Sequence, residues 1–569
     1  MRLRNIILAI IALSVSISFF PAEGKTAVET AIEEKEEFIS SKYLAVVHAI
    51  NSRDYKSVAK FLNQALNIAP NDKVLKKRAV LPFVHAGDVE KAISLVKESE
   101  DLSANIKMLL LVDKVQKGDY KTAEEVLKEI GDKEIHGILY KYLEVWLTAG
   151  QGDMKKAFAL FDEMPEDLQN LSFTQYHKGL LYELSGDEKA SIKQYEKAIE
   201  SGGDRYRMYE ALACGYIRQG NQDKAKETYR KYKELYNNFI IPDEITCDVG
   251  LITDAKQGVS ESMMYAVLFF TYHRMTEHAY FYLQLAENLT PESSFLKFVI
   301  GDFLTHYGNY NDAIRVYEKV PPTSPLYLRI QVSMAGIYEV IGEKDIAKKM
   351  LFEMAYKHNT YEFWELLAGI PLREKKFEEA IEYYTKAISL IKEPKEEHWN
   401  LFFSRGNSYE RLKNWDKAEA DFLKVLEIKK DEPYTLNYLA YSWIEQGKNL
   451  EQSKEMLEKA LEQQPNSPYI MDSYAWALFY LGDYEGALSY MEKAVEIMPY
   501  NSTLNEHLGD IYWRLGRKRE AKFQWKRAIY YASEDNDEFD EKAIQNKLLK
   551  GLPPLDENHK IKPTIKAEK

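Results

Sequence analysis

Residues 468–499 read PYIMDSYAWALFYLGDYEGALSYMEKAVEIMP, and residues 502–528 read STLNEHLGDIYWRLGRKREAKFQWKRA. In both stretches apolar side chains recur every three or four residues, a glycine interrupts them near the middle, and small residues recur after it. Gly482 and Gly516 are 34 residues apart, as are Ala494 and Ala528. This spacing predicts amphipathic helices, and the central glycine predicts a turn between two of them. The two stretches therefore predict a repeated pair of helices.

The same pattern extends over most of the chain. Six units precede residue 237, with turns at Asp54, Gly87, Gly118, Gly152, Gly186 and Gly220. The pattern is absent from residues 237–259, resumes around Ala279, and continues in units that begin near residues 294, 328, 361, 399, 433, 468 and 502. About fourteen units result. Units this short cannot bury an apolar face alone, so each is expected to stack on its neighbours instead of forming three or four separate domains.

The repeated unit resembles the tetratricopeptide repeat. In residues 468–499 the resemblance is carried by Tyr474-Ala475, Gly482-Asp483-Tyr484, Ala487, Ala494 and Pro499. It implies an all-α fold: a right-handed superhelical solenoid of about 14 helix-turn-helix units, closed by a C-terminal capping helix. In this family small residues let the two helices of a unit cross closely, while glycine ends the first helix and proline ends the second.

The pattern also predicts the division of the chain. We expect a signal peptide at 1–24, an array of degenerate repeats at 25–236, an irregular connector at 237–259, a second array at 260–535, a capping helix at 536–550 and a disordered tail at 551–569. The capping helix is predicted from apolar residues at helical spacing, among them Ile544 and Leu548. The tail is predicted from its polar, lysine-rich composition.

The N-terminal residues have the layout of a secretory signal peptide. Arg2 and Arg4 precede an apolar stretch at residues 6–20, and small residues stand before a cleavage site after Gly24. This layout predicts a periplasmic or secreted protein, with an uncleaved N-terminal membrane anchor as the alternative. No cysteine is present for lipidation near this site, and nothing else in the sequence requires membrane association.

Composition and cysteine content exclude several classes of function. Lys and Arg number 76 and Asp and Glu number 89, so the net charge of −13 disfavours nucleic acid as a partner. With 27 Gly and 18 Pro in 569 residues, the chain is too poor in turn formers for a turn-dense all-β protein. Cys214 and Cys247 are the two cysteines. Unpaired small residues are the preferred interpretation, and one disulfide in an oxidising compartment is the alternative.

The sequence contains no recognisable catalytic or cofactor motif. It has no glycine-rich phosphate loop, no His-Glu-x-x-His and no Gly-x-Ser-x-Gly. His273 and His278 are five residues apart, which places them poorly for a shared metal on one helix face. We therefore expect a protein without enzymatic activity, cofactor or metal.

The resemblance to tetratricopeptide repeats instead implies binding on the concave side, which the first helix of each unit lines. Carrying the family's groove positions over to this sequence gives the partner-binding residues Asn407, Arg411, Asn437, Tyr441, Asp472, Trp476, Tyr480, Glu506, Asp510, Trp513 and Arg514. Tyr441, Trp476 and Trp513 form an aromatic row in consecutive units, of the kind that binding hot spots use. The alternative is that these rings pack between adjacent units.

A further resemblance covers residues 399–550. The segments LNYLAYSW at 436–443, GKNL at 447–450, YIMDSYAW at 469–476 and EHLGD at 506–510 are similar to the C-terminal array of exported tetratricopeptide proteins of Gram-negative bacteria. Some of those proteins are outer-membrane lipoproteins that act as adaptors for a periplasmic carboxyl-terminal processing protease. This chain departs from them in lacking a lipidation cysteine. It also departs from the family's two-carboxylate clamp, since Tyr438 stands where a second asparagine belongs.

The resemblance implies a non-catalytic scaffold or adaptor of the cell envelope that binds a protein or peptide in its concave groove. A periplasmic protease or an envelope-assembly protein is the partner that it suggests. The alternative is an envelope assembly or structural protein that acts through self-association or glycan binding.

Overall fold

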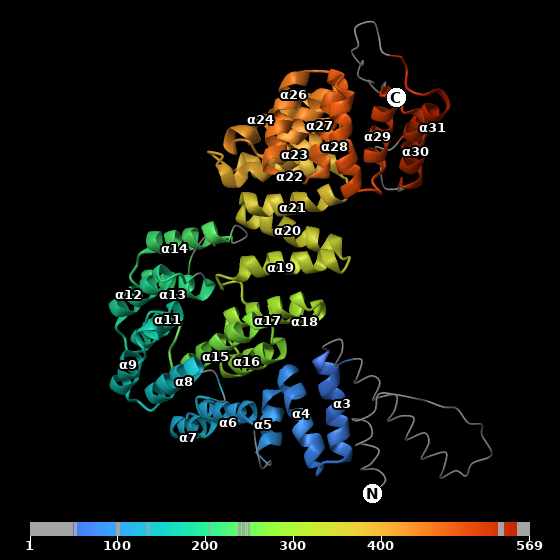
Figure 1. The fold of residues 1–569 in the computed structure, drawn as a ribbon. Helices are drawn as coiled ribbons and strands as arrows, with labels where there is room; N and C mark the ends of the chain where they lie inside the picture. The colour runs from blue at the N-terminus through green and yellow to red at the C-terminus, as the bar shows by residue number, and fades with distance from the viewer. Residues whose placement is uncertain are drawn as a thin grey trace, which may run out of the picture. The chain divides into compact units, whose positions relative to one another are not determined.

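The computed structural model describes residue 49 and residues 54–97, 103–133, 135, 137–203, 205–236, 240–241, 245, 247, 251–532 and 540–554 (Figure 1). Over these residues every regular element is a helix, which confirms the predicted all-α class. The chain divides into two compact units, Met1–Gly342 (unit 1) and Glu343–Lys569 (unit 2). The expected signal peptide, and the expected tail beyond residue 554, lie outside the described residues.

Unit 1 consists of successive helix pairs in which each helix packs on the next. Its helices are α3 (Tyr55–Ile68), α4 (Lys73–His85), α5 (Val89–Val96), α6 (Ala104–Gln116), α7 (Tyr120–Ile130), α8 (Gly137–Gly150), α9 (Met154–Asp162), α10 (Glu166–Gln169), α11 (Ser172–Leu184), α12 (Glu188–Glu200), α13 (Tyr206–Arg218), α14 (Gln222–Leu235), α15 (Ala255–Tyr272), α16 (Thr276–Leu289), α17 (Ser294–His306), α18 (Tyr310–Tyr317) and α19 (Tyr327–Val340).

Unit 2 continues the same arrangement. Its elements are α20 (Lys344–His358), α21 (Tyr361–Arg373), α22 (Phe377–Ser389), the short 3-10 helix η1 (Glu396–His398), α23 (Trp399–Arg411), α24 (Trp415–Ile428), α25 (Pro433–Glu445), α26 (Leu450–Gln463), α27 (Pro468–Leu481), α28 (Tyr484–Ile497), α29 (Ser502–Arg514), α30 (Lys518–Tyr530) and α31 (Glu541–Lys550). We call the side formed by the first helix of each pair its inner face and the side formed by the second helix its outer face.

Turn chemistry explains where the helices of a pair begin and end. Gly482 ends α27 with φ 88°, a left-handed conformation that glycine adopts without strain. Asp483 then begins α28, because its side chain accepts a hydrogen bond from the backbone N–H of Gly486 at 2.9 Å. The turn between α25 and α26 places Asn449 in the left-handed region at φ 49°. The sequence pattern thus fixes both ends of the turn.

The small residues of the first helices are required by aromatic rings of the second helices. A β carbon added at Gly179 would lie 2.5 Å from the Tyr195 ring. A β carbon at Gly509 would come equally close to the ring of Trp525, which is fully buried. In both pairs the ring follows the glycine by 16 residues. The expected small residue of the first helix is therefore a glycine in these two pairs because it admits a ring of the second helix.

The connector expected at 237–259 differs from the structure at its end. α15 begins at Ala255 because Asp254 caps it, with its side chain and that of Gln257 bonded to each other's backbone N–H groups. Cys247 forms a disulfide with Cys214 of α13, with the two Cα atoms 5.3 Å apart. The preferred interpretation of two unpaired cysteines was therefore wrong, because the connector folds back onto α13 and brings them within bridging distance.

Two further boundaries differ from expectation. The division between compact units lies between Gly342 and Glu343, inside the repeat expected from residue 328, and not at the connector. The capping helix α31 begins at Glu541, later than the expected residue 536, because the Asp540 side chain accepts a hydrogen bond from the N–H of Ala543 and caps the helix there.

Unit 1 also departs from simple stacking of neighbours. α15 packs against α8 and α11, and α16 packs against α4 and α6, which are first helices of pairs far earlier in the chain. Figure 1 shows α15 beside α8 after the chain has passed through α14. The pair α15–α16 therefore covers the inner face of the preceding pairs in unit 1. Among the described residues, no helix combines the length and the apolar character needed to cross a membrane.

Candidate functional site

The predicted binding residues lie on the first helices α23, α25, α27 and α29 of unit 2. On α23, Asn407 is half-buried and Arg411 is exposed, and on α25, Asn437 and Tyr441 are half-buried. The Oδ1 atom of Asn437 is enclosed and has no hydrogen-bond partner in the described part of the chain. Because this oxygen is enclosed, a ligand does not reach it unless the Asn437 side chain turns.

Trp476 of α27 is buried, with 7% of its surface exposed. Its ring stacks on His507 of α29 with centroids 3.9 Å apart, and its Nε1 donates a hydrogen bond to Glu445 of α25 at 3.1 Å. Tyr480 is half-buried one turn later in α27, and its ring packs against the same indole with centroids 5.5 Å apart. For Trp476 the interpretation as an exposed ring was wrong, because α25 and α29 enclose it from both sides. Packing between adjacent pairs is what the structure shows.

A buried ion pair lies directly beneath this indole. His507 Nδ1 is 2.7 Å from Asp472 Oδ1, and both residues are buried. Burial alone lowers the pKa of His507, but the neighbouring carboxylate of Asp472 raises it to about 9. His507 is therefore an imidazolium at neutral pH, and Asp472 holds α27 against α29 and is not offered to a partner.

The capping helix α31 covers the inner face of α29. Lys547 reaches from α31 to Asp510 at 2.6 Å and to Glu506 at 2.8 Å. Asp510 also accepts a hydrogen bond from the Trp525 indole at 2.8 Å. Burial raises the pKa of Asp510, and Lys547 opposes that shift. Two of the predicted binding carboxylates are thus engaged within the chain.

The other two predicted residues of α29 are engaged by the segment that follows α31. Arg514 Nη1 donates a hydrogen bond to the carbonyl oxygen of Pro553 at 2.8 Å. Gly551 lies so close to the Trp513 indole that a β carbon at this position would overlap the ring. Trp513 itself is half-buried and also packs on the Trp525 ring at 5.3 Å. The predicted aromatic row is therefore interrupted at α29, and the positions that keep solvent exposure are Asn407, Arg411, Asn437, Tyr441 and Tyr480.

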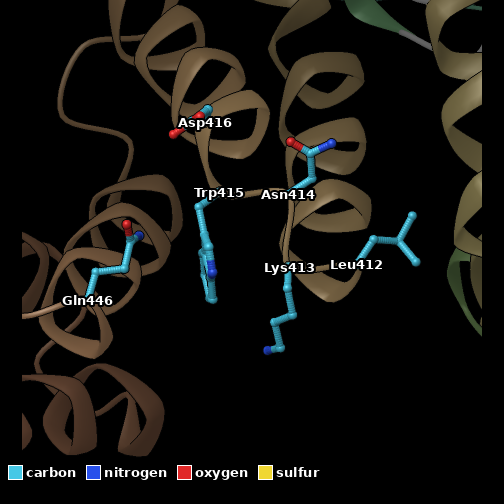
Figure 2. Close-up of a pocket in the computed structure, with 6 residues that line it drawn as sticks. All are labelled: Leu412, Lys413, Asn414, Trp415, Asp416 and Gln446. Atoms are coloured by element: carbon cyan, nitrogen blue, oxygen red, sulfur yellow. The ribbon is translucent and has the colours of Figure 1, made fainter. Parts of the chain in front are cut away.

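A shallow pocket opens beside these positions, at the edge where the first helices end (Figure 2). It is lined by the α23–α24 turn and the end of α25, with the residues Leu412, Lys413, Asn414, Trp415, Asp416 and Gln446. The ammonium of Lys413 lies 5.1 Å from the centre of the Trp415 ring. The sequence prediction did not include these residues, because a turn residue such as Lys413, at φ 59°, is indistinguishable by pattern from any other turn.

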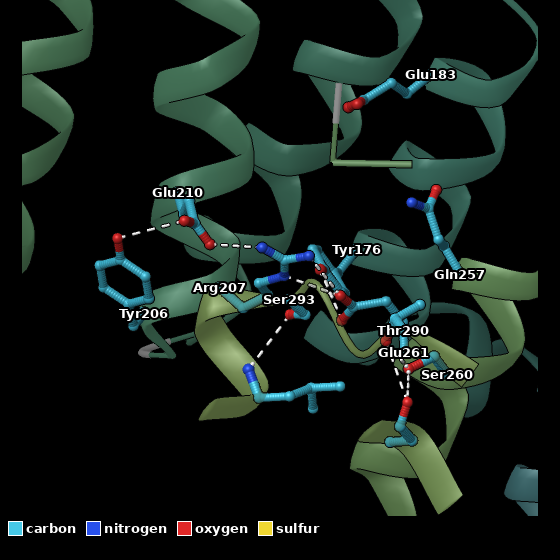
Figure 3. Close-up of polar contacts among 12 residues, drawn as sticks. Tyr176, Glu183, Tyr206, Arg207, Glu210, Gln257, Ser260, Glu261, Thr290 and Ser293 are labelled. Atoms are coloured by element: carbon cyan, nitrogen blue, oxygen red, sulfur yellow. Dashed lines mark hydrogen bonds and ion pairs between the residues drawn. The ribbon is translucent and has the colours of Figure 1, made fainter. Parts of the chain in front are cut away.

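The inner face of unit 1 is, by contrast, filled by a buried polar network (Figure 3). Glu261 of α15 pairs with Arg207 of α13 at 2.7 Å and accepts a hydrogen bond from the Tyr176 hydroxyl of α11 at 3.0 Å. Arg207 pairs with Glu210 as well, at 2.7 Å. Although burial disfavours its charge, the two carboxylates raise the pKa of Arg207 further. Ser260, the neighbour of Glu261 in α15, forms a hydrogen bond with the hydroxyl of Thr290, which follows the last residue of α16.

Apolar contacts complete the filling. Trp146 of α8 is fully buried, and the backbone of Gly258 in α15 lies against its ring. The Trp146 Nε1 donates a hydrogen bond to His177 at 2.9 Å, and burial lowers the pKa of that histidine to about 3. His177 is therefore a neutral acceptor. An isolated glycine in a helical pattern is the sequence signal that could have indicated this close approach.

The fold and these faces define a class: an all-α protein of stacked helix pairs, several of which cross at a glycine. Family models described as Tetratricopeptide repeat match residues 174–201, 206–239, 361–394, 400–432, 436–467, 468–501 and 503–535. These stretches correspond to α11–α14 and α21–α30. The chain therefore contains tetratricopeptide repeats at these residues.

Two curated relatives match part of the chain. The TPR repeat-containing protein MJ1428 of Methanocaldococcus jannaschii is 26% identical over 260 residues, which are 46% of this chain and 42% of that protein. The human protein O-mannosyl-transferase TMTC1 is 20% identical over 213 residues, which are 37% of this chain and 20% of that protein. The chain thus spans less than half the length of either relative.

Solved structures are similar at low identity. The Cut9–Hcn1 hetero-tetramer of the APC/C contains a chain that is 13% identical, with 90% of this chain and 96% of that chain covered and a TM-score of 0.37. A tetratricopeptide repeat protein of Parabacteroides merdae is 18% identical, with 51% and 97% covered and a TM-score of 0.32.

Proposed function

We propose that this protein is a non-catalytic scaffold that holds a segment of a protein partner on the inner face of α23, α25 and α27 in unit 2. The observation that carries the proposal is that two other stretches of inner face are covered by helices of the same chain. In unit 1 the pair α15–α16 packs on α4, α6, α8 and α11. In unit 2, Lys547 of α31 engages the carboxylates of α29. The stretch between α23 and α27 is the part of the predicted groove that remains open to solvent.

The side chains of this stretch suit an extended peptide or a helix. The side-chain amide of the half-buried Asn437 can form hydrogen bonds with a peptide backbone. Tyr441 and Tyr480 are half-buried rings held in place by packing, and rigid aromatics are typical anchors of protein interfaces. Arg411 adds an exposed cation at the edge. The combination offers backbone recognition, aromatic contact and one charged contact.

We also propose that the protein acts in the cell envelope or outside the cell. The layout of residues 1–24 supports export, and the Cys214–Cys247 disulfide supports an oxidising compartment. A periplasmic protease or an envelope-assembly protein is the partner that this location suggests. Sequencing the N-terminus of the protein recovered from cells tests export: a start at Lys25 supports cleavage, and a start at Met1 contradicts it.

Site-specific photo-crosslinking in the full chain tests the inner face. A photoreactive amino acid replaces Tyr441 or Tyr480, and matched controls carry it at Tyr434 and Tyr469, which are exposed at the opposite ends of α25 and α27. The proposal expects one partner to crosslink at both inner positions and at neither control. Equal yields at all four positions would contradict it.

The same experiment separates the runner-up function. If the crosslinked product at Tyr441 and Tyr480 is a second copy of this chain, the inner face serves self-association and the protein is an assembly component. Light scattering over a range of concentrations then shows an oligomer that grows with concentration. A single mass at all concentrations, with a different protein in the crosslinked product, supports the scaffold.

A further inference from the structure

The outer helices of unit 2 differ sharply in charge. α22, α24, α26 and α28 each contain more carboxylates than cations. α30 carries five Lys or Arg residues and a single Glu over its 13 residues. α20 also carries four Lys against one Asp and one Glu, but two of these lysines pair with Glu374 and Glu379. In a chain of net charge −13, α30 is the more strongly basic of these two outer helices.

The side chains of α30 are sorted between two faces. Its buried stripe is Ala521, Trp525 and Ala528, which packs inward. On the opposite face, at the matching helical spacing, lie Phe523 and Tyr530, which are 59% and 80% exposed. Large rings with this exposure on a folded helix are not part of its core, so they form a separate surface.

Cations surround these two rings. Arg519, Lys522 and Lys526 are exposed, and within the described chain no carboxylate forms an ion pair with any of them. Arg527 lies over the Phe523 ring at 5.9 Å and donates a hydrogen bond to the Pro499 carbonyl oxygen. The surface is therefore a pair of exposed rings inside a group of available positive charges.

Neighbouring rings enlarge the aromatic part of this surface. Tyr500, 70% exposed, packs on Tyr531 with centroids 5.1 Å apart, and Tyr531 packs on Tyr530 at 5.0 Å. The rings thus form a contiguous patch that joins the outer face of α30 to the N-terminal end of α29. We call the set Tyr500, Arg519, Lys522, Phe523, Lys526, Arg527, Tyr530 and Tyr531 the basic aromatic patch.

We propose that the basic aromatic patch docks the protein onto an anionic phospholipid surface. Lipid phosphates would meet the lysines and arginines, Tyr530 would lie at the level of the headgroups, and Phe523 would enter the acyl boundary. A soluble polyanion explains the cations but gives no reason for an exposed Phe at their centre. The overall charge of −13 also disfavours nucleic acid.

Co-sedimentation of the full chain with vesicles tests the proposal. Vesicles of phosphatidylcholine alone are compared with vesicles of phosphatidylcholine and phosphatidylglycerol. The test variant carries Arg519→Gln, Lys522→Gln and Lys526→Gln. The matched control, Lys417→Gln, Lys459→Gln and Lys493→Gln, removes three exposed cations from the outer helices α24, α26 and α28 and changes the net charge equally.

Wild type is expected to bind the anionic vesicles in preference to the neutral ones, and less so as salt rises. Each lysine or arginine near an anionic surface contributes about a fivefold factor, so the test variant should lose on the order of 100-fold in affinity. The control variant should bind as wild type does. A second variant, Phe523→Ser, should weaken vesicle binding and leave the helix content measured by circular dichroism unchanged.

Three results would overturn the proposal. The first is equal binding of wild type to neutral and anionic vesicles. The second is an equal loss in the test and control variants, which would show that overall charge alone decides binding. The third is binding to soluble polyglutamate that matches binding to vesicles and is unaffected by Phe523→Ser. That result would assign the patch to an acidic protein.

Discussion

Raising the pH above neutrality is expected to loosen the packing of α29 on α27. Burial alone lowers the pKa of His507, but Asp472, with smaller contributions from Glu506 and Asp510, raises it to about 9. A histidine in an unfolded chain has a pKa of about 6.5, so the folded unit binds the His507 proton more tightly than the unfolded chain does. The stabilisation is therefore fully present below about pH 6.5 and is lost as the pH rises to about 9. The difference corresponds to about 3 kcal/mol.

Hydrogen exchange followed by mass spectrometry measures this change locally, which a global unfolding curve of a repeat protein does not. After correction for the intrinsic exchange rate, peptides from α27 and α29 should lose protection by on the order of 100-fold between about pH 6 and about pH 9. Peptides from α23 and α24 in the same sample serve as the internal control. His507→Gln removes the titrating group and should abolish the pH dependence of α27 and α29.

The reasoning is refuted if wild type and His507→Gln lose protection equally over this range. It is also refuted if α23 and α24 change as much as α27 and α29, since the titrating group would then lie elsewhere. Asp472→Asn offers an independent check. It removes the carboxylate at 2.7 Å from His507 and leaves the shape of the side chain nearly unchanged. In this variant the protection of α27 and α29 should depend little on pH, and it should already be reduced at low pH.

Three other changes are expected to act on the packing. Cys247→Ser opens a loop of 33 residues, for which chain entropy gives a loss of about 4 kcal/mol, so the first urea transition of unreduced protein should come earlier than in wild type. Gly509→Ala places a β carbon against the buried Trp525 indole and should destabilise the fold by about 1–3 kcal/mol. Gly336→Ala has open space around it and should stabilise the fold by up to about 1 kcal/mol. Equal thermal midpoints of the two variants would contradict both expectations. Arg207→Met leaves the buried carboxylates of Glu210 and Glu261 without their cation and should cost about 3–5 kcal/mol, seen as faster proteolysis of unit 1, and adding Glu210→Gln together with Glu261→Gln should reverse most of the loss.

The helix pairs themselves could be predicted because their signals are local. Gly482 and Asp483 specify the end of one helix and the start of the next within two residues. Gly179 and Gly509 are local signals too, because a glycine inside a helix pattern indicates that another helix approaches closely there. Such signals repeat at the same spacing along the chain, so a unit with a weak signal can be predicted from the spacing of its neighbours.

The exposure of the predicted site residues could not be read from the same signals. Helical periodicity places Trp476 on the first-helix side of its pair, but it does not say how closely α25 and α29 approach. In the structure they enclose the indole between Glu445 and His507. Trp513 and Arg514 are covered by a segment 38 to 39 residues further on, around Gly551 and Pro553. Contacts between residues so far apart in the sequence do not appear in the spacing of apolar residues.

The return of the chain in unit 1 was beyond prediction for a related reason. The repeat pattern is absent from the first residues of α15, and only Gly258, against Trp146, indicates a close partner there. The disulfide between Cys214 and Cys247 depends on the same return, since it requires the connector to lie on α13. Two cysteines 33 residues apart carry no distance information until that path is known.

The filling of the inner face of unit 1 by α15–α16 has a consequence for how the protein folds. In an array where each pair contacts only its neighbours, folding can start anywhere and spread along the chain. Here Tyr55 of α3 reaches Glu277 of α16 across 222 residues, and Gln116 of α6 reaches Asn288 across 172. Contacts of such high contact order form late and slowly. A chain emerging from its N-terminus would therefore complete the packing of α3 to α16 as a single cooperative step, once α16 is available.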